Sequence, residues 1–210
     1  MEKVTLIGVQ HKRTDEISGL VGLIRSIEGR RVGLEVPQGY FQSNRKVFYF
    51  GELAQELKDR GYECFAIDSP KLRKATRILS IARRLYEEPA KADEYTGLIA
   101  ELKRTINPYM SPEIEGPKKE IVRDYSIAVD IFSRTTREEF EKVWKRLQKK
   151  RERAMAENIK KSGVQIAVVG KRHLQGIKSR LRPWFRIKSA VETIEFPRPI
   201  NPLYLKFFVS

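Results

Sequence analysis

The chain has 210 residues, 40% of them hydrophobic, which fits one globular domain or one domain with an elaborated middle. Its 42 Lys and Arg exceed its 27 Asp and Glu, and the net charge of +15 attracts nucleic acid, anionic membranes and anionic substrates alike. One cysteine, Cys64, excludes an internal disulfide framework, and its neighbours YECFAI favour a buried strand residue over a nucleophile. No signal peptide is recognised, and no apolar run approaches the roughly 18 residues that span a bilayer. We therefore expect a cytoplasmic protein without a membrane span.

Short apolar runs predict the strands of an α/β fold. Because they lack strict alternation, they suit strands buried on both faces of a mostly parallel or mixed central sheet flanked by helices. Between the second and third runs, FGELAQELKDRG places Leu53, Ala54 and Leu57 on one stripe and predicts a crossover helix that stops at Gly61. The four runs are Val4–Ile7, Val32–Val36, Cys64–Ile67 and Ile166–Val169.

The pattern changes after the third run. We expect a single α/β domain over residues 1–190, with a helical insertion at about 71–161 that returns to the sheet at Ile166. The insertion shows helical periodicity broken around Pro89, Pro108, Pro112 and Pro117. Residues 191–210 are rich in proline and aromatic residues and predict an extended arm, which packs on the domain or on a second subunit of a homo-oligomer.

The helix before the last strand carries an unexpected arginine. Thr135 and Glu138 form a capping box, and Phe140, Val143, Trp144 and Leu147 mark an apolar stripe. Continued at helical spacing, this stripe meets Arg151. Either Arg151 points inward to a buried anion or a site, or its charged end reaches past the apolar edge into water.

Both histidines of the chain occur in the same local pattern, an apolar strand followed by G-x-x-H. His11 follows Gly8, and His173 follows Gly170. Ligand sites of open α/β sheets lie at the carboxyl ends of the strands, where both histidines are expected. A single histidine in such a position would favour a structural role. Because both histidines of the chain occur there, we expect a functional site.

Two acidic residues complete the candidate set. In VGLEV, Val32, Leu34 and Val36 share one face of a strand, and Glu35 points to the other, where burial demands a cation, donors or protonation. Arg151 or a metal could supply that charge. Asp68 closes the third run, although an aspartate before Ser-Pro is also typical of a turn or a helix cap.

Two imidazoles and a carboxylate are sufficient ligands for a divalent transition metal with open positions. His11 and His173 would bind the metal, Glu35 would be a ligand or general base, and the bound water would attack a peptide or small-molecule substrate. Without a metal, the same groups could act as a general acid and base, with Arg151 stabilising negative charge. Nucleotide-binding loops, a serine-nucleophile motif and paired cysteines are all missing from the sequence.

These segments together resemble the TraB/PrgY family, which belongs to a superfamily with the Tiki metalloproteases, the erythromycin esterases and the ChaN-like haem-binding proteins. The resemblance rests on the first G-x-x-H, on GLEV around Glu35, on KRERAMAENI and on VVGKRHLQGI. Arg151 of the family's helix motif is kept, whereas Lys150, Glu152 and Ala154 replace its usual glutamate, aspartate and tyrosine. Tiki-type relatives imply a metal-dependent protease, and esterase-like relatives imply a hydrolase that uses histidine and glutamate.

The leading hypothesis is thus a metal-dependent hydrolase, and two binding functions remain open. Lys171 to Lys188 holds seven basic residues, no acidic residue and two aromatic residues, which could bind nucleic acid, or could simply form a solvated basic face. Haem or another small ligand is the second alternative, implied by the ChaN-like relatives. The candidate nucleic-acid contacts are Lys171, Arg172, Lys178, Arg180, Arg182 and Arg186.

Overall fold

The structure is a computed structural model that describes residues 4–10, 16–42, 48–106, 112–182 and 191–195. The chain divides into two compact units. The first unit contains Met1–Pro70 and Lys149–Ser210, and the second contains Lys71–Gln148. Within the described residues, no helix combines the length and apolarity that crossing a bilayer requires.

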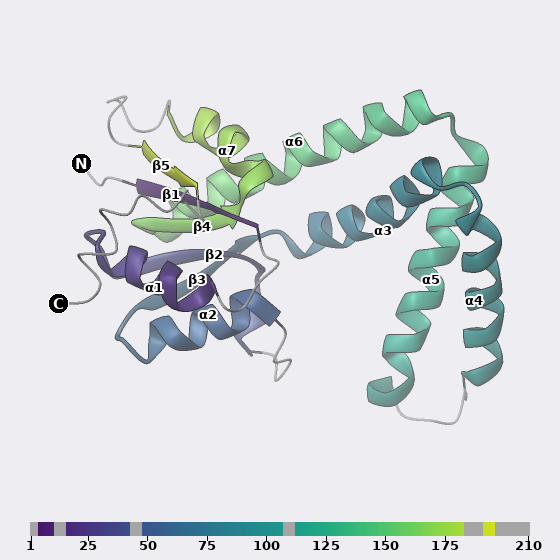
Figure 1. Ribbon diagram of the computed structural model, residues 1–210, viewed down its shortest axis with the longest axis horizontal. Helices are drawn as coiled ribbons and strands as arrows, with labels where there is room; N and C mark the ends of the chain where they lie inside the picture. The colour runs from purple at the N-terminus through teal and green to yellow at the C-terminus, as the bar shows by residue number, and fades with distance from the viewer. Residues whose placement is uncertain (1–3, 11–15, 43–47, 107–111, 183–190, 196–210) are drawn as a thin grey trace. The chain divides into compact units, whose positions relative to one another are not determined.

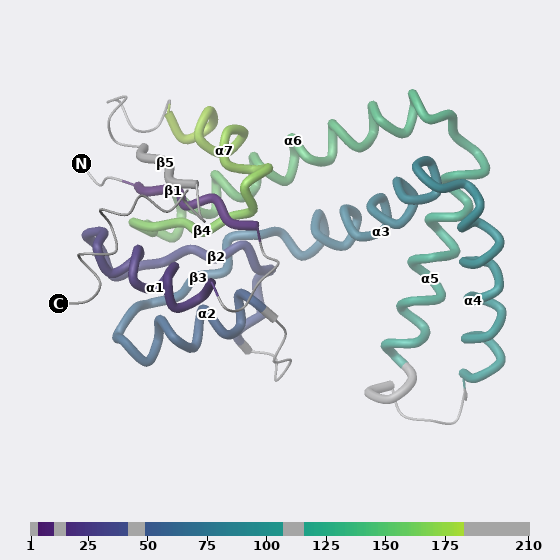
Figure 2. Tube along the Cα trace, in the orientation of Figure 1, coloured from purple at the N-terminus to yellow at the C-terminus, as the bar shows by residue number. Residues whose placement is uncertain are grey.

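The first unit contains a parallel sheet of five strands in the order β3-β2-β4-β1-β5 (Figure 1). The predicted α/β fold with a mostly parallel sheet is therefore confirmed. Strands β1 and β4 lie side by side although they are far apart in the chain, as the colours of Figure 2 show. The strands are β1 (Val4–Val9), β2 (Arg31–Pro37), β3 (Glu63–Asp68), β4 (Ile166–Gly170) and β5 (Val191–Glu195), and each of the four predicted runs lies in one of the first four.

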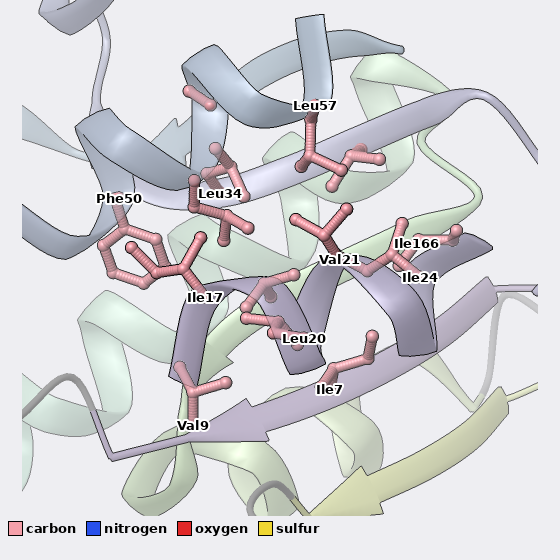
Figure 3. Close-up of a cluster of buried hydrophobic side chains, with 14 of the residues drawn as sticks. Ile7, Val9, Ile17, Leu20, Val21, Ile24, Leu34, Phe50, Leu57 and Ile166 are labelled. Carbon is pink, nitrogen blue, oxygen red and sulfur yellow. The ribbon is translucent and has the colours of Figure 1, made fainter. Parts of the chain in front are cut away.

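Helices α1 (Ile17–Arg25) and α2 (Phe48–Lys58) cover one face of the sheet. Helix α1 carries a stripe of apolar residues at helical spacing that packs on the sheet. Helix α2 carries the predicted stripe of Leu53, Ala54 and Leu57. Gly61 follows α2 with a φ of 77°, a conformation that favours glycine, and ends the helix as predicted. Figure 3 shows the core between this face and the two helices, which includes Ile7, Leu20, Ile24, Leu34, Leu57 and Ile166.

The opposite face of the sheet is covered by α7 (Leu174–Leu181) and by the part of α6 (Arg137–Ser162) that belongs to the first unit. Gly8 lets the chain after β4 approach β1, because a Cβ at Gly8 would lie 3.3 Å from Leu174 Cδ2 and 3.4 Å from Lys171 Cα. The second core lies here and includes Leu6, Met155, Ile159, Ala167, Val169 and Ile177.

The second unit consists of α3 (Pro70–Glu87) from Lys71 onward, α4 (Lys91–Thr105), α5 (Pro112–Arg134) and α6 as far as Gln148. The predicted helical insertion is present, but this compact unit ends at Gln148 rather than near residue 161, because the rest of α6 packs on the sheet. The predicted break at Pro117 is wrong, since α5 continues through this proline. The core of the unit includes Leu79, Ala82, Ala128, Phe140 and Trp144.

Two details of α6 differ from the expected pattern. The capping box is formed by Thr136 and Glu139, one residue later than predicted: Glu139 Oε2 accepts from Thr136 N at 2.9 Å, and Glu139 N donates to Thr136 Oγ1 at 3.3 Å. Val143 of the predicted stripe is 49% exposed, so only part of that stripe is core.

The predicted C-terminal arm is partly corrected. Residues 191–195 form β5, which pairs in parallel with β1 and therefore belongs to the sheet. Residues 196–210 lie outside the described residues, so packing of this segment on the domain or on a second subunit stays a prediction.

Candidate functional site

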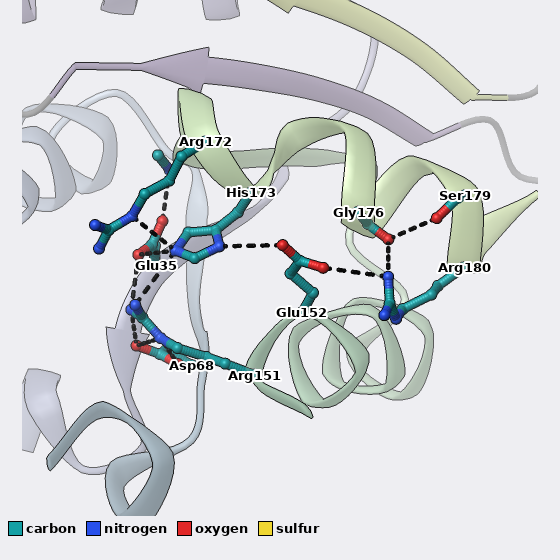
Figure 4. Close-up of polar contacts among 10 residues, drawn as sticks. Glu35, Asp68, Arg151, Glu152, Arg172, His173, Gly176, Ser179 and Arg180 are labelled. Carbon is teal, nitrogen blue, oxygen red and sulfur yellow. Dashed lines mark hydrogen bonds and ion pairs between the residues drawn. The ribbon is translucent and has the colours of Figure 1, made fainter. Parts of the chain in front are cut away.

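Arg151 of α6 binds two carboxylates and one imidazole inside the first unit (Figure 4). Its Nε donates to Asp68 Oδ1 at 3.0 Å, and its Nη2 donates to Asp68 Oδ2 at 2.6 Å and to Glu35 Oε1 at 2.7 Å. Its Nη1 lies 3.3 Å from His173 Nε2. All four residues are buried, with Arg151 only 3% exposed, so of the two orientations that the sequence left open for this arginine the inward one is observed.

The parallel sheet explains why these residues meet. Glu35 comes from β2 and Asp68 ends β3, and the carboxyl ends of parallel strands meet at one edge of a sheet. The pairing of β2 with β4 ends at Leu34 and Val168, and beyond it Gly170 N donates to Glu35 Oε2. The expected burial of Glu35 opposite Leu34 and Val36 is therefore confirmed. Asp68 Oδ1 also accepts from the neighbouring Ser69 N at 2.9 Å, just before α3 (Pro70–Glu87) begins.

Charge complementarity keeps the guanidinium ionised in this interior. Burial acts against the charged form, but the hydrogen bonds and negative charges of Asp68 and Glu35 outweigh it and raise the pKa of Arg151. Removing one partner from such a group leaves uncompensated buried charge, which costs about 3–5 kcal/mol. The cluster is therefore a strong constraint on how β2, β3 and α6 assemble.

His173 lies directly beyond Arg151, at the end of the short 3-10 helix η3 (Lys171–His173) that follows β4. Its Nε2 accepts from Arg172 Nε at 3.2 Å and faces Arg151 Nη1. Two guanidinium donors assign Nε2 as the unprotonated nitrogen, so that the hydrogen of the neutral ring is on Nδ1. Burial is the main cause that lowers the pKa of His173 to about 4, and Arg151 and Arg172 add to it, although Glu35 acts in the opposite direction.

Glu152 is a member of the site that the sequence did not single out. Its Oε1 lies 3.6 Å from His173 Nδ1, on the side of the ring opposite Arg151 (Figure 4). Its Oε2 accepts from Arg180 Nη1 at 3.2 Å. No sequence pattern marked it: that the adjacent residues Arg151 and Glu152 lie on opposite sides of one imidazole is visible only in the structure.

The predicted metal site is not formed by the described residues. His11 lies outside them, so its meeting with His173 and Glu35 stays a prediction. Among the described residues, no group of three His, Cys, Asp or Glu is arranged to hold a metal ion. The lone pair of His173 Nε2 faces two guanidinium groups, and both oxygens of Glu35 accept hydrogen bonds. These donors do not fit a divalent metal in this arrangement.

The basic residues of the nucleic-acid alternative are distributed over η3 and α7. Arg172 contacts His173, and Arg180 is held by Glu152 and by the carbonyl oxygen of Gly176. Lys171 and Arg182 are exposed and Lys178 is half-buried, whereas Arg186 lies outside the described residues. Part of this basic set thus serves contacts within the unit, and binding of nucleic acid or haem stays a prediction.

The cysteine lies in a strand, as the sequence predicted, but it is half-buried rather than buried. Cys64 lies in β3, and burial raises the pKa of its thiol to about 11, so that it remains protonated at neutral pH. It therefore lacks the thiolate character of a nucleophile.

In comparisons with known proteins, no family model, no curated protein and no solved structure matches this chain. The resemblance to the TraB/PrgY family accordingly remains a prediction from the motifs.

We predict that Arg151→Met lowers the free energy of unfolding by about 3–5 kcal/mol, because it leaves Glu35 and Asp68 buried without their guanidinium. Urea unfolding followed by circular dichroism measures this loss. Arg153→Met is the matched control on the same helix: the Arg153 side chain is 77% exposed, and its loss should change stability by no more than about 0.5 kcal/mol. Equal effects of the two substitutions would contradict the account of the cluster.

We also predict a pH dependence that comes from His173. Because its pKa falls from 6.5 to about 4 on folding, the unfolded chain binds one more proton between these values. The free energy of unfolding should therefore decrease as the pH is lowered through this window, by on the order of 3 kcal/mol. Urea titrations between pH 7 and pH 4 should show a weaker slope for His173→Asn than for the wild type. The same slope in both proteins would show that His173 is not protected from protonation.

Proposed function

We propose that the protein is a hydrolase that acts by general acid–base catalysis through His173. The observation that carries the proposal is a buried imidazole whose Nε2 faces two guanidinium groups at the carboxyl edge of the sheet. Burying charged residues around a titratable group is costly, and such groups are frequent at functional sites. This supports the metal-free form of the predicted hydrolase over the metal-dependent form.

The two arginines differ in their exposure to solvent. Arg151 is buried and bound to two carboxylates, whereas Arg172 is an exposed residue whose Nε reaches His173. In the proposed mechanism an anionic substrate group replaces His173 Nε2 as the acceptor for Arg172 Nε, which leaves Arg151 Nη1, at 3.3 Å, as the remaining donor that Nε2 must exchange for a proton. Arg172 would remain beside the reacting atoms as a donor to negative charge.

The reaction that follows uses water as the nucleophile. As the water oxygen bonds to the acyl carbon of an ester or amide, Nε2 of His173 takes its proton, and the carbonyl oxygen becomes an oxyanion that Arg172 stabilises. The bond to the leaving group then breaks, and His173 returns the proton to the leaving oxygen or nitrogen. Glu35 Oε1, which lies 3.8 Å from Nε2, stabilises the transient imidazolium.

The charge distribution favours an anionic acyl compound or an acidic peptide as the substrate. Residues 149–210 contain 15 Lys and Arg and 4 Asp and Glu, which is +11 of the net +15 of the chain. This segment includes η3 and the site residues Arg151 and Arg172. A positive field around the site would raise the local concentration of an anionic substrate.

The direct experiment is hydrolysis of a negatively charged chromogenic ester and of an acidic fluorogenic peptide. We expect wild-type protein to exceed the uncatalysed rate on at least one of them, and His173→Asn to lower that rate about 100-fold or more. Arg153→Met serves as the control and should leave the rate unchanged, because this side chain is exposed and lies outside the site.

A metal chelator distinguishes the metal-free mechanism from the metal-dependent one. We expect the rate to survive it, since the proton is carried by His173 alone. Loss of activity with chelator, followed by recovery with a first-row metal, would overturn the metal-free mechanism in favour of the metal-dependent one. A rate that does not respond to His173→Asn, or no hydrolysis of either substrate, would overturn the proposed function.

A further inference from the structure

The nitrogen of His173 that faces away from Arg151 is in an unusual position. Among the described residues, Nδ1 has no hydrogen-bond partner although the residue is 1% exposed. An unsatisfied buried N–H is costly, so a nearby acceptor should be part of the working arrangement. The nearest acidic group is Glu152, whose Oε1 lies 3.6 Å away.

The surroundings of Glu152 hold its carboxylate at this place. Arg180 Nη1 donates to Glu152 Oε2 at 3.2 Å and to the carbonyl oxygen of Gly176 at 2.6 Å, which ties the carboxylate to the backbone of α7. Figure 4 shows the chain of contacts that runs from His173 through Glu152 to Arg180. The side chain is therefore fixed from the side opposite the imidazole.

Gly176 provides the space that this carboxylate occupies. A Cβ at position 176 would overlap the carboxylate of Glu152, so any other residue there would force the acidic group aside. Gly97 of α4 gives the contrast, because no atom lies within 4 Å of its Cβ position. Position 176 thus requires a glycine because the Glu152 carboxylate occupies the space that a Cβ would need.

We propose that Glu152 is the positioning residue of His173: it accepts the Nδ1 hydrogen, and thereby directs the Nε2 lone pair toward Arg151 and Arg172. A small rotation of either side chain would shorten the separation of 3.6 Å to hydrogen-bond length. The same carboxylate would stabilise the ring when Nε2 takes a proton, as the acidic member of a catalytic triad does. This catalytic consequence rests on the proposed hydrolase function, whereas the position of the hydrogen does not.

The imidazole hydrogen can be observed directly by nuclear magnetic resonance with ¹⁵N-labelled histidine. The chain has only two histidines, so a His11→Asn background leaves His173 as the single imidazole signal. We expect the Nδ1–H form, with a protected Nδ1 hydrogen. Glu152→Ala should abolish that protection, and Glu152→Gln should retain it, because the amide oxygen still accepts a hydrogen bond.

Gly176→Ala tests whether Glu152 needs this space, without substituting either Glu152 or His173. Because the added methyl group displaces the end of a flexible side chain, we expect the fold to survive and the Nδ1 hydrogen to lose protection as in Glu152→Ala. The double variant should resemble either single one, since both substitutions remove the same contact. Two controls should leave the signal unchanged. Gly97→Ala alters an open position on α4, and Glu157→Ala removes an exposed acidic residue on α6.

Turnover of the ester or peptide provides the second readout. We expect Glu152→Ala and Gly176→Ala each to lower it about 10- to 100-fold, by analogy with the loss seen when the outer partner of a metal-ligating histidine is removed. A hydrogen on Nε2, or an Nδ1 signal that is indifferent to both substitutions, would overturn the positioning role. The spectrum is recorded on resting protein, so its outcome is independent of whether any substrate is hydrolysed.

Discussion

The guanidinium of Arg151 is the group on which the rest of the sheet edge depends. It satisfies Asp68 with Nε and Nη2, Glu35 with Nη2 and faces His173 with Nη1, and it does so where water is excluded. A buried ion pair of this kind contributes little net stability compared with apolar packing, yet it is costly to leave incomplete. It therefore determines the register in which β2, β3 and α6 can meet more than it strengthens the fold. Asn158, two turns further along α6, adds a donor to the carbonyl oxygen of Ile67 at 3.0 Å and fixes the same helix to β3.

The cluster also determines the chemistry that His173 can perform. A guanidinium on one side and a carboxylate on the other give the two ring nitrogens opposite environments, so that one tautomer is favoured and the ring stays neutral. Glu35 and Asp68 are occupied by Arg151, which makes them counter-charges rather than a second general base. The same occupation explains why the described donors do not form a metal site, although the residue types alone suggested one. Within the described residues, the proposed catalysis is therefore proton transfer at Nε2 of His173.

Much of the fold was predictable because buried parallel strands leave a simple signature. The runs around Leu6, Leu34, Ile67 and Val168 are short, mostly apolar and without strict alternation, and all lie in the sheet. Helical periodicity offered the inward orientation of Arg151 as one of two alternatives, and strand alternation predicted the burial of Glu35. The end of the helical unit within α6 and the continuation of α5 through Pro117 were missed, because tertiary packing decides both. Glu152 was missed for a related reason: its role depends on space beside Gly176, and no spacing rule records such space.

The coupling between Arg151 and Asp68 tests the central claim most directly. It is measured by a double-mutant cycle in which Arg151→Met and Asp68→Asn are made singly and together, and the free energy of unfolding is determined for all four proteins. If the guanidinium compensates this buried carboxylate, the double variant should lose less stability than the sum of the single variants, by about 2 kcal/mol or more. Additive losses would show that the two residues are energetically independent, and the account of a site organised around Arg151 would then be wrong.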